Sequence, residues 1–166
     1  VEDGPVRLVM LDTMQPGSHS GHCPEAVAGW LERTLAARPG VPTLLFMHHP
    51  PFVTGMGAMD EPFENVGRLA DILSRSPWVR LCCGHMHRPI VTQWAGCIAL
   101  TSPAVSMQID LDLSPEGGDP FRMETPGYLL HHWDGSVLNS HICQIPCSPT
   151  FSGPHPFVGS VNPVEG

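Results

Sequence analysis

The chain has 166 residues, and because 16 are acidic and 8 are basic, its formal net charge is −8. No cluster of lysine and arginine occurs, which argues against a long nucleic acid as partner because binding its phosphates requires such a cluster. No apolar run reaches the roughly 18 residues that would span a bilayer. We therefore expect a cytoplasmic protein with no membrane partner.

The cysteines follow neither the spacing of a disulfide framework nor that of a zinc ribbon. Cys82 and Cys83 lie within an apolar stretch. We therefore interpret the cysteines as small buried residues of a protein in a reducing compartment. A disulfide from Cys143 to Cys147 or to Cys23 is the alternative.

The first half of the chain alternates strand-like and helix-like patterns. Residues 24–35 have apolar side chains at helical spacing, with proline in the first turn and Pro39-Gly40 as the stop. Residues 43–47 are apolar on both faces, as in a strand covered by helices. The order predicts an α/β layered sheet, with strands at 6–11, 43–47 and 78–83 and helices at 24–35 and 63–74. Because residue 1 is valine and strand 6–11 has no turn before it, we expect the whole protein to begin earlier.

From residue 90 on, the pattern changes to short alternating segments. They predict antiparallel strands at 90–94, 97–101, 127–133 and 137–145, and Asp134-Gly135 is a strong hairpin signal. A stretch at about 106–126 is expected to leave the sheet as a small cap. We expect residues 1–145 to form the domain and residues 146–166, rich in proline, glycine and serine, to form an extended tail.

Two histidine clusters follow directly on apolar runs. They are His48-His49-Pro50-Pro51 and Gly84-His85-Met86-His87. Imidazoles at the ends of buried strands supply neutral nitrogen donors at the rim of a sheet, where a metal ion can be held and solvent can still reach it. Gly84 allows a sharp turn after its strand, and the next two imidazoles can point to two metal ions. The spacing therefore indicates metal-dependent hydrolysis.

These motifs resemble the calcineurin-like metallophosphoesterase family, and within it the branch of cyclic nucleotide phosphodiesterases and glycerophosphodiesterases. The likeness runs to about residue 145. It implies a metallophosphoesterase-type β-sandwich flanked by helices, of which this chain holds the C-terminal half. The matching segments are Leu11-Asp12-Thr13, Trp30-Leu31, Met47-His48-His49-Pro50-Pro51, Met59-Asp60, Glu64-Asn65, Cys83-Gly84-His85-Met86-His87 and Thr101-Ser102-Pro103.

The resemblance also implies a ligand set and a reaction. His48 and His85 would bind one metal ion and His87 the other, while His49 would contact the ligands without binding metal itself. The two divalent or trivalent ions, Fe, Mn, Zn or Co, would polarise a small phosphodiester and generate the attacking hydroxide. The family's earlier motifs, Asp-x-His, Gly-Asp and Gly-Asn-His-Asp/Glu, which include a bridging aspartate, do not occur ahead of the histidine clusters in this chain. Met107 stands where some relatives place a histidine before glutamine.

The leading hypothesis is thus a metal-dependent phosphodiester hydrolase with part of its ligand set missing from this chain. The alternative is an inactive fragment or a non-catalytic oligomerisation module of the same family. A zinc-binding protein that uses only the histidine clusters is a third hypothesis. Because relatives use the cap region to dimerise or build larger assemblies, we expect a homo-oligomer.

Overall fold

The computed structural model describes residue 1 and residues 3–146. Its centre is a five-stranded sheet in which all neighbouring strands are parallel except the last, antiparallel pair. The predicted α/β class is confirmed, and the metallophosphoesterase-type β-sandwich stays a prediction. The strand order is β1 (Arg7–Met10), β3 (Thr43–Met47), β5 (Val79–Cys83), β7 (Cys97–Thr101) and β6 (Ile90–Trp94).

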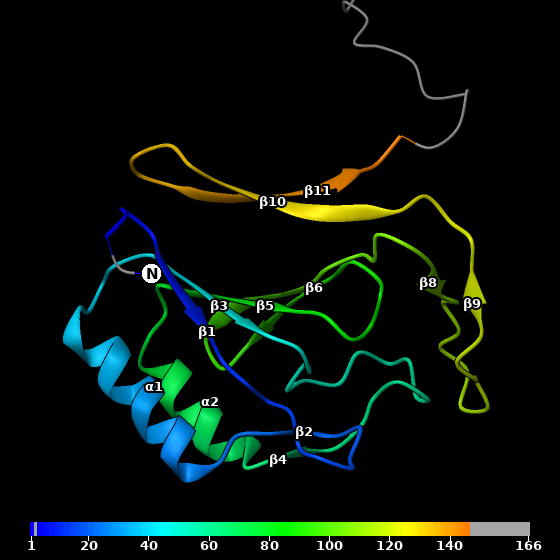
Figure 1. Cartoon of the computed structure of the whole chain (residues 1–166), viewed down its shortest axis with the longest axis horizontal. Coiled ribbons are helices and arrows are strands. Elements are labelled where there is room, and N and C mark those ends of the chain that lie inside the picture. The colour runs from blue at the N-terminus through cyan, green and yellow to red at the C-terminus, as the bar shows by residue number, and fades with distance from the viewer. Residues whose placement is uncertain (2, 147–166) are drawn as a thin grey trace, which may run out of the picture.

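Two helices, α1 (Glu25–Ala37) and α2 (Val66–Ser74), cover one face of this sheet (Figure 1). Each presents an apolar stripe because its buried residues recur at helical spacing. Together with inward side chains of the strands, they form the main core. Its most deeply buried members include Ala28, Leu31, Leu35, Leu45, Leu69, Ile72, Leu73, Leu81 and Ala99.

The antiparallel hairpin of β10 (Gly127–Trp133) and β11 (Leu138–Gln144) lies over the other face (Figure 1). The predicted turn is confirmed: the Asp134 side chain accepts hydrogen bonds from the backbone amides of Ser136 and Val137, each at 2.8 Å. Among the described residues, no ladder of backbone hydrogen bonds joins the hairpin to the five-stranded sheet. Arg80 Nη1 donates to Ser140 Oγ at 2.7 Å, and Leu129 and Leu138 pack against Leu44, Cys82 and Leu100.

The second predicted helix begins three residues later than expected. Residues 63–64 instead form a short strand, β4 (Phe63–Glu64), parallel to β2 (Gly21–His22). Asn65 then takes a left-handed conformation, with φ of 59°, and its side chain donates to the Cys23 carbonyl at 3.2 Å instead of capping the helix. This strand pair positions a loop beside the histidines.

The stretch at 106–126 leaves the central sheet and forms a small antiparallel pair of its own. The pair consists of β8 (Gln108–Ile109) and β9 (Phe121–Arg122). Arg88 ties it to the sheet by donating to the Ile109 carbonyl and, at 2.7 Å, to Glu124. Its role as an oligomerisation cap stays a prediction.

Arg7 is a fully buried charged residue, with 0% of its surface exposed. It lies on β1, and its guanidinium donates to the carbonyls of Thr34 and Arg38 at the C-terminal end of α1, both at 2.7 Å. A cation at this end is favoured because the last carbonyls of a helix lack partners and carry partial negative charge. Arg7 thereby joins the edge strand to the helix layer.

The cysteines of the described residues are free thiols. Cys23 and Cys143 are therefore not bonded to each other, and a pairing of Cys143 with Cys147 lies outside the described residues. Burial raises the pKa of Cys82 to about 12 and that of Cys97 to about 11, so both thiols stay protonated. In the part of the chain that is described, no helix is long and apolar enough to cross a lipid bilayer.

Candidate metal centre

The two histidine clusters meet because β3 and β5 are parallel neighbours. Met47 and Cys83, the last residues of the two strands, stand opposite each other in the register. The residues that follow therefore emerge at the same edge of the sheet. The Gly84 amide donates to the His48 carbonyl at 3.0 Å, which joins the two strand ends just before the histidines diverge.

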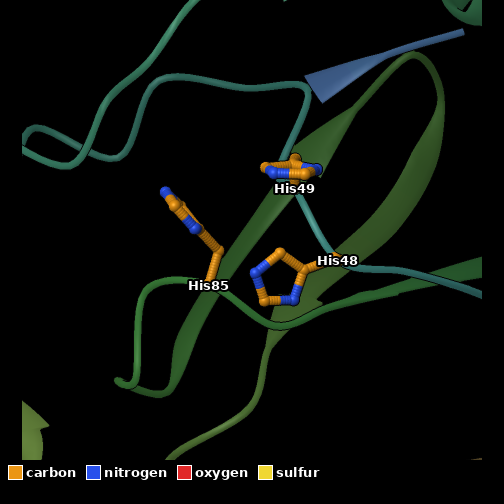
Figure 2. A group of neighbouring side chains, drawn as sticks. All are labelled: His48, His49 and His85. Carbon is orange, nitrogen blue, oxygen red and sulfur yellow. The ribbon is translucent and has the colours of Figure 1, made fainter. Parts of the chain in front are cut away.

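Three imidazoles gather at this edge. The centroid of the His48 ring lies 4.8 Å from that of His49 and 5.3 Å from that of His85, and His49 and His85 are also 5.3 Å apart. One ring nitrogen from each lies within 4.8 Å of the other two. Figure 2 shows the three rings bordering one small space, two of them from the end of β3 and one from the loop after β5.

The loop after β5 is tightly turned. His85 and His87 both have left-handed backbones, with φ of 65° and 51°, and the Met86 amide donates to the Gly84 carbonyl at 2.7 Å. Such conformations are uncommon outside glycine and concentrate at functional sites. Met86, only 1% exposed, anchors the turn in the interior and leaves the two imidazoles on either side of it.

His49 is the most enclosed of the three, with 6% of its surface exposed. Its Nδ1 lies 2.9 Å from the hydroxyl oxygen of Thr13, itself 1% exposed, so a hydrogen bond fixes the ring. Gly21 packs against the same residue: a Cβ added there would lie 2.6 Å from the His49 Cβ. These contacts hold the His49 ring in place at the side of the site.

Two of the three predicted metal ligands have ring nitrogens that are less well satisfied than those of His49. His85 Nε2 and His87 Nδ1 are buried and have no hydrogen-bond partner among the described residues. Buried polar atoms normally have hydrogen-bond partners, so each of these nitrogens is a candidate to bind a partner that does not belong to the chain. His87 does not belong to the group of three, and its assignment to a second metal ion stays a prediction.

Burial lowers the pKa of the three grouped imidazoles, because it disfavours the charged form. Neighbouring imidazoles lower the pKa of each ring further: His87 acts on His48, His48 on His49, and both grouped neighbours on His85. A lowered pKa keeps the rings neutral near pH 7. Neutral imidazole is the form that binds a metal ion.

A cavity of about 290 Å³ opens beside these rings, and His49, His85 and Glu61 are among the residues that line it. Sequence reasoning missed Glu61. One of its carboxylate oxygens, Oε2, is buried without a hydrogen-bond partner among the described residues, and its charge acts to raise the pKa of His49 and of His85 against the effect of burial. A single glutamate in a loop carries no signal in the sequence that could have identified it.

The three imidazoles fit a metal ion. Nitrogen ligands of one tetrahedral ion, each at about 2.1 Å, lie about 3.4 Å from one another, so nitrogens within 4.8 Å need only small side-chain rotations to converge. No carboxylate joins this group within the described residues. The imidazoles alone offer no negative charge to offset that of the ion, so further ligands must complete the site.

Comparison with curated proteins identifies the relatives of the chain, although no family model matches it. It is 38% identical over 161 residues to the "Probable glycerophosphodiester phosphodiesterase GpdQ" of Arcobacter nitrofigilis, which covers 95% of this chain and 58% of the relative. It is 33% identical over 146 residues to the glycerophosphodiester phosphodiesterase GpdQ of Enterobacter lignolyticus, and this match covers 85% of the chain and 51% of the relative. It is 35% identical over 137 residues to the 3',5'-cyclic adenosine monophosphate phosphodiesterase CpdA of Escherichia coli K12, and this match covers 79% of the chain and 48% of the relative.

The chain thus spans about half the length of the curated relatives it matches. Their names agree with the resemblance carried by the two histidine motifs. The relatives of the chain are thus glycerophosphodiester and cyclic nucleotide phosphodiesterases, and its match to about half of each is consistent with part of a calcineurin-like metallophosphoesterase.

Proposed function

We propose that the chain is part of a metal-dependent phosphodiester hydrolase with a two-metal site. The observation that carries the proposal is the gathering of His48, His49 and His85, with nitrogens within 4.8 Å of one another, at the carboxyl edge of a parallel sheet. This edge is where α/β sheets bind ligands. The relatives named as phosphodiesterases support the same reaction class.

Each histidine has a distinct proposed role. His48 and His85 bind one metal ion and His87 the other, while His49, held by Thr13, orients the neighbouring rings and excludes water from behind them. When bound, the ions, which are Fe, Mn, Zn or Co, supply Lewis acidity and a nucleophilic hydroxide at neutral pH. The left-handed turn at His85 and His87 fixes the directions of their imidazoles before any ligand arrives.

The substrate in this proposal is a small phosphodiester. Two of the relatives are named for glycerophosphodiesters and one for 3',5'-cyclic adenosine monophosphate. A cavity of about 290 Å³ beside the imidazoles has room for the alcohol part of such a molecule. The proposal includes a cytoplasmic location, where thiols stay reduced, and a homo-oligomer assembled through the stretch at 106–126.

The alternative of an inactive fragment or oligomerisation module is not favoured, because the matching relatives are named as enzymes. A histidine site that binds zinc without catalysis stays the second candidate, since no carboxylate joins the three imidazoles in the described part of the chain. Metal binding and turnover must therefore be measured separately.

The test uses His48→Ala and His85→Ala, with His141→Ala as the matched control because His141 is an exposed histidine of the distant hairpin. Titration calorimetry measures Mn²⁺ binding, and release of nitrophenolate from bis(p-nitrophenyl) phosphate measures turnover. We expect the two site variants to lose at least about tenfold in Mn²⁺ affinity and to lose turnover. Unchanged affinity in both site variants would reject the metal centre, and metal binding without turnover in the whole protein that contains this chain would reject the hydrolase.

A further inference from the structure

His87 differs from His49 in how its ring is held. Thr13 fixes the ring of His49 by a hydrogen bond, whereas Nδ1 of His87 is buried and has no hydrogen-bond partner among the described residues. The backbone of His87 is left-handed, with φ of 51°. Such a conformation is uncommon outside glycine and persists where the surrounding structure holds it. The direction of the His87 imidazole therefore depends on what holds the backbone on either side of it.

Both chain neighbours of His87 are held by the β8–β9 pair. Met86, on one side, is buried in a small apolar cluster that includes Ile109 of β8. Arg88, on the other side, donates from Nε to the carbonyl of the same Ile109 and from Nη2 to Glu124 at 2.7 Å. One residue of β8 thus takes part in holding both flanks of His87.

The link through Arg88 is enclosed and continues into the central sheet. Only 14% of the Arg88 side chain is exposed, and hydrogen bonds that involve a charged group are roughly twice as strong as neutral ones. The Arg88 carbonyl accepts from the hydroxyl of Thr101 at the end of β7, and this hydroxyl accepts from the Ile90 amide at 2.9 Å. Arg88 therefore connects three parts of the structure: the sheet, the turn that carries His87, and the β8–β9 pair.

We propose that Arg88 is a positioning residue, through which the β8–β9 pair holds His87 in the direction that metal binding requires. This inference rests on the proposed function, because that function makes His87 the ligand of the second ion. Arg88 itself touches neither the metal nor the substrate. Coupling between two sites acts equally in both directions, so an ion bound at His87 stabilises the β8–β9 pair by the same factor by which the pair strengthens binding of that ion.

The experiment compares Arg88→Met with Arg122→Met in the whole protein that contains this chain. Arg88→Met removes both hydrogen bonds from the side chain to the β8–β9 part. Arg122→Met is the matched control, because Arg122 of β9 forms its ion pair with Asp110, directly after β8, and not with the histidine turn. Glu124→Gln removes only the outer end of the link, and it tests the same coupling if Arg88→Met does not fold.

Calorimetry measures Mn²⁺ binding, and deuterium exchange of the Asp110 amide, which donates to the Pro120 carbonyl at 2.7 Å, measures opening of the β8–β9 part. In the unaltered protein we expect Mn²⁺ to slow this exchange about tenfold, the factor by which loss of a residue that supports a metal ligand lowers metal affinity. Arg88→Met should bind one of the two ions about tenfold more weakly and lose the effect of Mn²⁺ on exchange. Arg122→Met should keep both properties, and Glu124→Gln should reduce both.

The inference would be overturned if the unaltered protein bound two ions while exchange of the Asp110 amide did not respond to Mn²⁺. It would also be overturned if Arg88→Met bound both ions with unchanged affinity and sped the exchange by the same factor with and without Mn²⁺, as a merely structural residue would. Hydrolysis of bis(p-nitrophenyl) phosphate, measured in parallel, separates the two proposals. Coupling without hydrolysis would reject the hydrolase and leave the role of Arg88 intact, and hydrolysis without coupling would do the reverse.

Discussion

Gly21 stands where β2 passes directly against His49, and the structure leaves no space there for a side chain. A Cβ at this position would lie 2.6 Å from the His49 Cβ and 2.6 Å from Phe63 Cδ2. Contacts this short do not occur, so Gly21→Ala must displace either the backbone of His49 or the β2–β4 pair. Overpacking of this kind costs about 1–3 kcal/mol. Because His49 is held by Thr13, much of the displacement should also reach the imidazole group.

The assay is urea unfolding followed by tryptophan fluorescence, with Mn²⁺ binding measured on the same preparations. With a urea dependence of about 1–3 kcal/mol per molar, the expected loss lowers the unfolding midpoint by roughly 1 M. Gly57→Ala is the matched control, because an added Cβ there meets nothing within 4 Å. It should change the free energy of unfolding by less than about 0.5 kcal/mol. If the two variants unfold at the same midpoint, the packing argument for His49 is wrong.

Three further predictions concern the same framework. Thr13→Val should lower the free energy of unfolding, measured by urea titration, by about 1–3 kcal/mol, because the buried His49 Nδ1 loses its hydrogen-bond partner. Thr13→Ser keeps the hydroxyl and should recover most of this loss. The pKa values of His48, His49 and His85 are lower in the folded chain than their ordinary value of 6.5, so on acidification the unfolded chain binds protons first. The free energy of unfolding should therefore fall as the pH drops below about 6.5. A free energy of unfolding that stays constant from pH 7 to pH 5 would contradict this. Arg7→Met should lower the free energy of unfolding by about 2 kcal/mol, measured by thermal unfolding, because the Thr34 and Arg38 carbonyls at the C-terminal end of α1 lose a charged donor. An unchanged midpoint would show that desolvation of the guanidinium cancels its hydrogen bonds.

Sequence patterns predicted most of the sheet because its strands are continuous apolar runs with clear ends. The bounds of β3, β6, β7 and β10 agree with the predicted ranges. The start of α2 was wrong for a physical reason. Phe63 fits the helical period, but its backbone pairs with Gly21, a contact across 42 positions that local patterns do not report.

The site was partly predictable for the same reason. His48 and His85 follow apolar runs, and parallel pairing of those runs brings them together. The position of His49 within the group depends on Thr13 and Gly21, whose contacts with it are tertiary. Glu61 was missed because it stands out only by a buried oxygen, Oε2, that has no hydrogen-bond partner in the described part of the chain, and this can be judged only from the folded structure.

The hairpin of β10 and β11 forms a sheet of its own, separate in hydrogen bonding from the five-stranded sheet beneath it. Its attachment through side chains such as Arg80 and Ser140 means that it can detach without breaking any ladder of the sheet that carries the histidines. Regions of this kind open as separate cooperative units with their own free energy. Amide hydrogens of β10 and β11 should therefore exchange with deuterium sooner than those of β3 and β5, and opening of the hairpin should leave the imidazole edge assembled.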